Sequence, residues 1–235
     1  MRRFAMICLP YLWLVALFLV PFLIVFKISL SDIDLAIPPY TPRLDFNAGW
    51  QGFLRFWAAL DFENYVFLTS DDLYWKAYLS SLRIAFISTT LTLLIGYPIA
   101  YGIARAKTEW RATLLMLVIL PFWTSFLIRV YAWMGILGTE GLLNQLLLAL
   151  GLIETPLTIL NTNWAVYIGI VYTYLPFMIL PIYASLEKLD NSLLEAAIDL
   201  GCSRLRAFWL ITMPLSKNGV VAGCFLVFIP ALGEF

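Results

Sequence analysis

The feature that most constrains this chain is a series of long segments without charged side chains. A bilayer core of about 30 Å requires roughly 20 apolar residues in a helix that rises about 1.5 Å per residue. The pattern predicts an all-α integral membrane protein with five visible spans, the fifth short or only just complete. The segments are Phe4–Phe26, Ile84–Ala104, Ala112–Thr139 interrupted only by Arg129, Thr155–Leu186 with a polar start over 156–163, and Asn218–Gly233.

The composition excludes several classes of function. Of the 235 residues, 62% are hydrophobic and 13% are charged, and the net charge is zero, so basic attraction to nucleic acid is excluded. The chain has no histidine, which removes the usual general base and the commonest transition-metal ligand. Its three cysteines share no C-x-x-C spacing, and no glycine-rich phosphate loop is present, so we predict no disulfide framework, no metal site, no catalytic residue and no ATP site in this chain.

The loop charges predict the orientation. Basic side chains are held on the cytoplasmic side during insertion, and with the N-terminus inside they collect there, whereas most acidic residues fall outside. A signal peptide at the N-terminus is the alternative, but its apolar stretch is too long and lacks a cleavage pattern, which favours a retained helix. The basic residues placed inside are Arg2, Arg3, Arg105, Lys107, Arg111, Lys188, Arg204, Arg206 and Lys217.

A long outer loop is expected over about 31–78. The prolines of Ile37-Pro-Pro-Tyr40 favour an extended start, because proline fixes φ and removes a hydrogen-bond donor. Aromatic residues at helical spacing in Trp50–Leu60 indicate either an amphipathic helix on the membrane surface or a loop packed on the helix ends.

Several residues inside the spans have two interpretations. Pro121, Pro176 and Pro181 should bend their helices, which suits a transport pathway but is also ordinary in membrane helices. Arg129 either extends toward the outer headgroups or faces the bundle interior and pairs there. The glycine patterns 219/223 and 135/138/141 permit close helix approach, within this chain or to a partner.

The loop over about 187–217 has a clear helical pattern. Ser192 and Glu195 have the spacing of a capping box, which predicts the start of a short helix. Gly201 suits the left-handed residue after that helix, and Ser203 can cap a second one. Glu195 and Asp199 repel each other at i,i+4 unless a basic partner faces them. The helix is therefore either a docking element or a solvated loop helix.

The order Glu195-Ala196-Ala197, Gly201, Phe208, Ile211 and Pro214 resembles the EAA loop of ABC importer permeases. In that family the loop forms the coupling helices that enter a cleft of a cytoplasmic ATPase. The resemblance implies that Glu195, Ala196, Ala197 and Gly201 form the ATPase contact and its turn.

Other segments resemble the polyamine permeases of this family, those of putrescine systems above all. Family members continue past the position of Phe235 through a further outer loop and a sixth helix, so a fragment or a truncated chain is expected. The segments are 21–30, 37–40, 120–133, 175–178 and 228–235.

The resemblance implies one permease domain over 1–235 in a bacterial inner membrane. Its partners would be ABC ATPases that bind the ATP, a second permease subunit and a periplasmic polyamine-binding protein, with putrescine as the expected substrate. A secondary transporter and a scaffold without transport are the alternatives. Arg129 is expected to hold a gate through an ion pair, and the candidate cavity-lining residues are Trp123, Thr124, Ser125, Tyr131, Trp133, Tyr172 and Tyr174.

Overall fold

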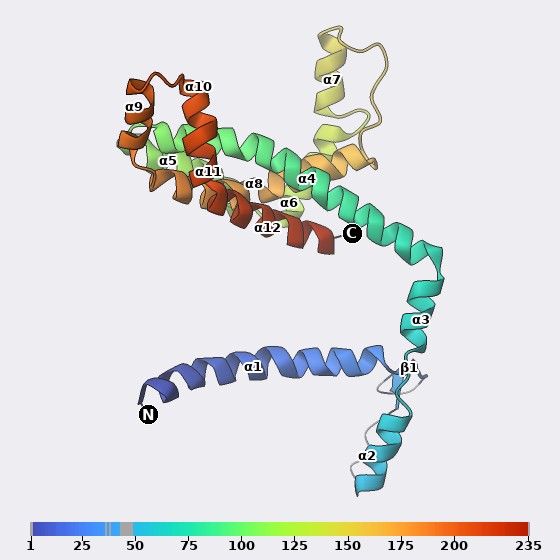
Figure 1. Cartoon of the computed structure of the whole chain (residues 1–235). Helices are drawn as coiled ribbons and strands as arrows, with labels where there is room; N and C mark the ends of the chain where they lie inside the picture. Colours follow the sequence, from blue (N-terminus) through green and yellow to red (C-terminus); the bar gives the residue numbers. More distant parts are fainter. Residues whose placement is uncertain (1, 36, 38, 43–48, 235) are drawn as a thin grey trace. The chain divides into compact units, whose positions relative to one another are not determined.

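The computed structural model describes residues 2–35, 37, 39–42 and 49–234. It is helical apart from one short hairpin, and its contacts divide the chain into two units, 1–76 and 77–235, which are described separately (Figure 1). Part of the predicted extended start of the 31–78 loop, including Pro38, lies outside the described residues.

The first unit begins with α1 (Arg2–Ser29), which contains the first predicted span. The antiparallel strands β1 (Asp32–Ile33) and β2 (Tyr40–Thr41) follow, as the extended start of the loop predicted. Next come α2 (Gly49–Ala58) and α3 (Glu63–Ser70). The predicted helix around Trp50–Leu60 is thus present as α2.

The end of α1 holds this loop through polar and aromatic contacts. The ammonium of Lys27 lies 3.7 Å from the ring centroid of Tyr40 and 5.4 Å from that of Phe56 on α2, within the range of a cation–π attraction. The amide of Asn64 on α3 donates to the carbonyls of Ser29 and Ser31, at 3.2 and 3.1 Å. These contacts fix α2 and α3 at the end of α1.

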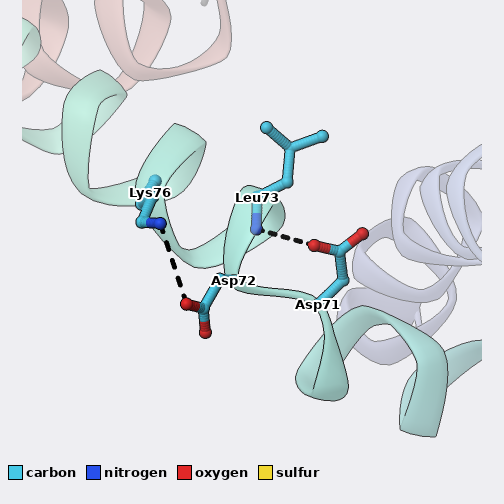
Figure 2. A network of polar contacts seen from close by, with 4 residues as sticks. All are labelled: Asp71, Asp72, Leu73 and Lys76. Carbon is cyan, nitrogen blue, oxygen red and sulfur yellow. Dashed lines mark hydrogen bonds and ion pairs between the residues drawn. The ribbon is translucent and has the colours of Figure 1, made fainter.

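The helix α4 (Asp72–Arg105) begins directly after α3. Figure 2 shows the carboxylate of Asp71 accepting a hydrogen bond from the backbone N–H of Leu73 at 2.8 Å, which satisfies a free donor in the first turn. Lys76 lies 3.7 Å from Asp72 on the same helix face, but both side chains are exposed, so this ion pair adds little.

The second unit is a bundle of α4, α8 (Asn163–Glu187) and α12 (Lys217–Gly233). Its main core combines residues of all three helices, including Ala100 of α4, Met178 of α8 and Val227 of α12, all fully buried. A second cluster contains Ile84, Tyr167, Ile170 and Ala231 with Ala85. Pro176 and Pro181 lie inside α8, which continues through both.

The third predicted span is wrong as a single helix. Its residues form α5 (Thr108–Ile119), the 3₁₀ turn η2 (Leu120–Trp123) and α6 (Phe126–Leu137). Pro121 has no N–H to continue the helix, and Thr124 and Ser125 adopt extended backbone angles. Pro121 was expected to bend its helix, and in the structure the helix breaks there. After α6, α7 (Leu142–Ala149) precedes α8.

The remaining elements are α9 (Asn191–Asp199), α10 (Arg204–Ala207), the π turn η3 (Phe208–Thr212) and α11 (Met213–Leu215), which lead into α12. Among the residues that the structure describes, four helical stretches are long and apolar enough to cross a bilayer: Pro10–Ser29, Asp72–Arg105, Phe126–Ala149 and Asn163–Glu187. A fifth forms if Arg204–Leu215 and Lys217–Gly233, bent by 63°, count as one span.

One of the two glycine patterns serves helix contact inside the chain. A Cβ at Gly219 would lie 2.5 Å from the carbonyl oxygen of Pro181, and one at Gly223 would lie 2.8 Å from Sδ of Met178. In the other pattern, Gly135 has open space around it and Gly141 lies against the backbone of its own turn. The backbone of α12 therefore approaches α8 closely only because residues 219 and 223 lack side chains.

We expect Gly219→Ala to lower the free energy of unfolding by about 1–3 kcal/mol, since the new methyl group would collide with the backbone of α8. Thermal unfolding of the detergent-solubilised protein measures this. Gly102→Ala on α4 is the matched control, because a Cβ there meets nothing within 4 Å and alanine favours the helix. Equal unfolding temperatures for both variants would contradict the close approach.

Candidate functional site

The 187–217 loop begins its first helix two residues earlier than predicted. The N-cap of α9 is Asp190, whose Oδ1 accepts a hydrogen bond from the backbone N–H of Ser192 at 2.9 Å. The prediction of a capping box formed by Ser192 and Glu195 is therefore wrong, because both residues lie inside α9. A carboxylate also interacts favourably with the positive end of the helix. The bond from the Ser192 N–H lowers the pKa of Asp190, so the ionised cap is lost only as the pH falls through that lowered pKa.

The end of α9 matches the prediction. Gly201 has φ of +83°, a conformation that side chains disfavour. The N–H of Cys202 donates to the carbonyl of Ala197, and the N–H of Gly201 donates to that of Ile198, both at 2.9 Å. These two bonds form a Schellman motif, which ends the helix sharply and turns the chain back.

The second half of the loop is anchored to α4. Ser203 caps α10 as predicted, with its Oγ accepting from the N–H of Arg206 at 3.4 Å. The Phe208 ring, at the start of η3, packs edge-on against Tyr97 and Tyr101 of α4, with centroids 5.8 and 5.6 Å apart. The Tyr97 hydroxyl also lies 2.9 Å from Oγ of Ser216. This half of the loop therefore cannot shift without changing its contacts with α4.

The surface of α9 is open to a partner. Glu195 and Ala196 are exposed, Ala197 is half-buried, and Asp199 is exposed one turn after Glu195. No ion pair involves Glu195 or Asp199 within the described residues. Leu200 at the end of α9 is 89% exposed. The helix thus presents two uncompensated carboxylates beside small and apolar side chains, a surface that suits a groove with basic residues.

A cavity of about 810 Å³ lies between α6, the start of α8 and the end of α12. We call it the Arg129 cavity. Three of the predicted pathway residues line it: Arg129 and Trp133 on one face of α6, and Tyr172 on α8. The rings of Trp133 and Tyr172 meet edge to face, with centroids 5.3 Å apart. Its lining residues are Phe126, Arg129, Val130, Trp133, Met134, Leu137, Leu160, Asn161, Thr162, Asn163, Ala165, Val166, Gly169, Ile170, Tyr172, Thr173 and Glu234.

The other five predicted pathway residues do not line the Arg129 cavity. Trp123 is 76% exposed and borders a separate apolar pocket beside α5, and Tyr131 is 69% exposed. Thr124 donates to the carbonyl of Pro121 at 2.7 Å, and Ser125 is the N-cap residue of α6. Tyr174 packs in the core beside the cavity. The sequence did not reveal which face of the broken third span would be turned inward.

Arg129 faces this cavity and forms no ion pair with another described residue. Its guanidinium lies 5.4 Å from the ring centroid of Phe122 and 6.0 Å from that of Phe126, so the aromatic rings stabilise its charge. Nε and Nη1 are buried and have no hydrogen-bond partner in the described part of the chain. The expected ion pair of Arg129 is thus not formed by the residues that the structure describes.

Sequence reasoning missed Glu234. This residue follows α12 and lines the Arg129 cavity, and its Oε1 accepts a hydrogen bond from the Tyr174 hydroxyl at 2.6 Å. Glu234 directly follows the fifth apolar run, Asn218–Gly233, and the sequence alone does not show that the end of this run meets α6 and α8. In the first unit, the carboxylates of Asp32, Asp61 and Glu63 also lie close together, but all three are exposed, and such groups are common without a metal ion.

These features describe a helical membrane protein with a cavity near one end of α8 and an open helical loop after the other end. The chain belongs to the family of binding-protein-dependent transport system inner membrane components, whose model matches residues 75–235. The match begins near the boundary between the two units.

Relatives support this assignment. The spermidine/putrescine transport system permease protein PotB of Haemophilus influenzae is 41% identical over 229 residues, which cover 97% of this chain and 74% of the relative. PotB of Escherichia coli is 50% identical over 173 residues, covering 74% of this chain and 62% of the relative. The fold resembles the crystal structure of a bacterial ABC transporter involved in alginate import, with a TM-score of 0.60 at 18% identity, over 98% of this chain and 72% of that one.

The N-cap of α9 gives a direct test of the loop's structure. We expect Asp190→Ala to weaken the first turn of α9, because the N–H of Ser192 loses its partner. Asp190→Asn retains an acceptor and should remain close to wild type. Hydrogen exchange of the 191–199 amides in the detergent-solubilised protein measures the difference, and equal exchange in both variants would show that Asp190 does not hold the helix.

Proposed function

We propose that this chain is the permease subunit of an ATP-driven, binding-protein-dependent importer that moves polyamines, putrescine among them, across a bacterial inner membrane. Membership of the permease family and the two PotB relatives, 41% and 50% identical, support the substrate class. The observation that carries the coupling part of the proposal is the open helix α9 ending at Gly201.

The proposed orientation places the N-terminus and the 187–217 loop in the cytoplasm. Basic residues in the first turn of α1, around the junction of α4 and α5, and within the 187–217 loop support this orientation. The partners would then be cytoplasmic ABC ATPases at the loop, a second permease subunit in the membrane and a periplasmic polyamine-binding protein on the other side. ATP would bind to the ATPases.

Coupling would proceed through α9. In this proposal α9 enters a groove of the ATPase, with Glu195 facing basic groups and Ala196 and Ala197 allowing close approach. The turn at Gly201 fixes the direction of the following segment. Closure of the ATPases would push this segment, and Phe208 would pass the movement to Tyr97 and Tyr101 of α4. The core then carries it to α8 and α12.

The Arg129 cavity would be part of the translocation path. Its walls combine aromatic rings, as in Trp133 and Tyr172, with polar groups such as Asn161 and Thr173. Ammonium groups bind to aromatic faces and carboxylates, whereas methylene chains pack on apolar walls. This mixture suits a flexible aliphatic amine better than a strongly hydrated inorganic ion.

The deciding experiment is uptake of radiolabelled putrescine by proteoliposomes that contain the complete complex. We expect uptake to require ATP hydrolysis and to be independent of a proton gradient. Glu195→Ala should reduce the initial rate about tenfold or more, and Gly201→Pro should abolish uptake because proline cannot adopt positive φ. Association with the ATPase should weaken in both variants.

Two controls separate coupling from misfolding. Gly201→Asn should retain most uptake, because asparagine tolerates the left-handed conformation. Glu140→Ala changes an exposed carboxylate outside the 187–217 loop and should have no effect. Uptake driven by a proton gradient would instead indicate a secondary transporter. Wild-type complex that binds its ATPase but imports no polyamine would indicate a scaffold or another substrate.

A further inference from the structure

We propose that Glu234 is the carboxylate that binds an ammonium group of the substrate in the Arg129 cavity, with Tyr174 as its positioning residue. This inference rests on the proposed import of polyamines and assigns the contact that recognises their charge. Among the described residues that line the cavity, Glu234 is the single acidic one and Arg129 the single basic one. The formal charges of the lining therefore cancel.

The environment of Glu234 leaves it available to a cation. The Tyr174 hydroxyl donates to Oε1 at 2.6 Å, and this short bond orients the carboxylate at the cavity wall. No ion pair forms on Glu234 within the described part of the chain, and the residue is exposed. An ammonium group can approach without first displacing a protein cation.

The neighbouring walls match the rest of an aliphatic amine. Trp133 and Tyr172 present aromatic rings, which attract a cation over their faces. Met134 and Ile170 add apolar surface, against which methylene groups pack. The cavity thus offers a carboxylate and aromatic rings to the ammonium group of a protonated amine, and apolar walls to its hydrocarbon chain.

Arg129 determines where the ammonium group can bind. Its permanent charge lies on α6, held near Phe122 and Phe126, and repels a second cation. The ammonium group is therefore directed to Glu234 and away from Arg129. The buried Nε and Nη1 of Arg129 have no hydrogen-bond partner, and no carboxylate lies within ion-pair distance of Arg129, among the residues that the structure describes.

The test is the concentration dependence of putrescine uptake by the complete complex in proteoliposomes. Glu234→Gln should raise KM about tenfold or more, because the neutral amide cannot pair with the ammonium group. Tyr174→Phe should raise KM a few-fold with an unchanged maximal rate, since the carboxylate remains but is less well oriented. Arg129→Gln should lower KM, because the repulsion is removed.

Glu154→Gln is the matched control, because Glu154 is an exposed carboxylate between α7 and α8 that does not line the Arg129 cavity. If Glu234→Gln does not assemble, Glu234→Asp replaces it, and a raised KM with a preserved maximal rate is expected. A wild-type KM in the assembled Glu234 variant would overturn the inference while the importer assignment stands. Absence of uptake by the wild-type complex would instead refute the proposed function.

Discussion

The second unit depends on the packing of one side chain, Met178 of α8, between two other helices. It is fully buried, and a Cβ at Gly96 of α4 or at Gly223 of α12 would lie only 3.0 or 2.8 Å from its side-chain atoms. The three helices thus meet around a flexible thioether that fills the gap left by the glycines. Because this contact holds α8 against both neighbours, it also positions the Arg129 cavity near one end of α8 and the 187–217 loop after the other.

Hydropathy predicted the membrane helices well because long apolar runs have few alternatives in a bilayer. It failed within the third run, which is long and largely apolar yet divides into α5, η2 and α6. A proline in a membrane helix is compatible with a bend or a break, and the choice depends on what satisfies the freed backbone groups. That information lies in tertiary contacts, so the sequence around Pro121 alone could not decide.

The loop was more predictable than the cavity because caps and turns act locally. Gly201 and Ser203 have the roles that their sequence neighbours indicated. Only the assignment of Ser192 as the N-cap was wrong, because Asp190, two residues earlier, takes that position and aspartate is also a good capping residue. The cavity depends on which faces of α6, α8 and α12 meet. Trp133 and Tyr131 are equally aromatic and two residues apart, yet only Trp133 faces inward, and Glu234 joins the site from a distant part of the chain.

The π turn η3 determines how the chain is rotated as it enters α12. Phe208 and Ser216 both contact Tyr97, although eight residues in a regular α-helix would place them about 80° apart around the axis. The additional residue of a π turn reduces this angle to about 20°. Deletion of one residue from Phe208–Thr212 would let the remaining residues form a regular α-helix, and seven residues at about 100° each give the same angle of about 20°, so the Gly219 and Gly223 face of α12 would keep its direction. The π turn thus accommodates its additional residue without changing the rotational phase of α12, and loss of that one residue would be tolerated better than a deletion inside the regular helix of α12.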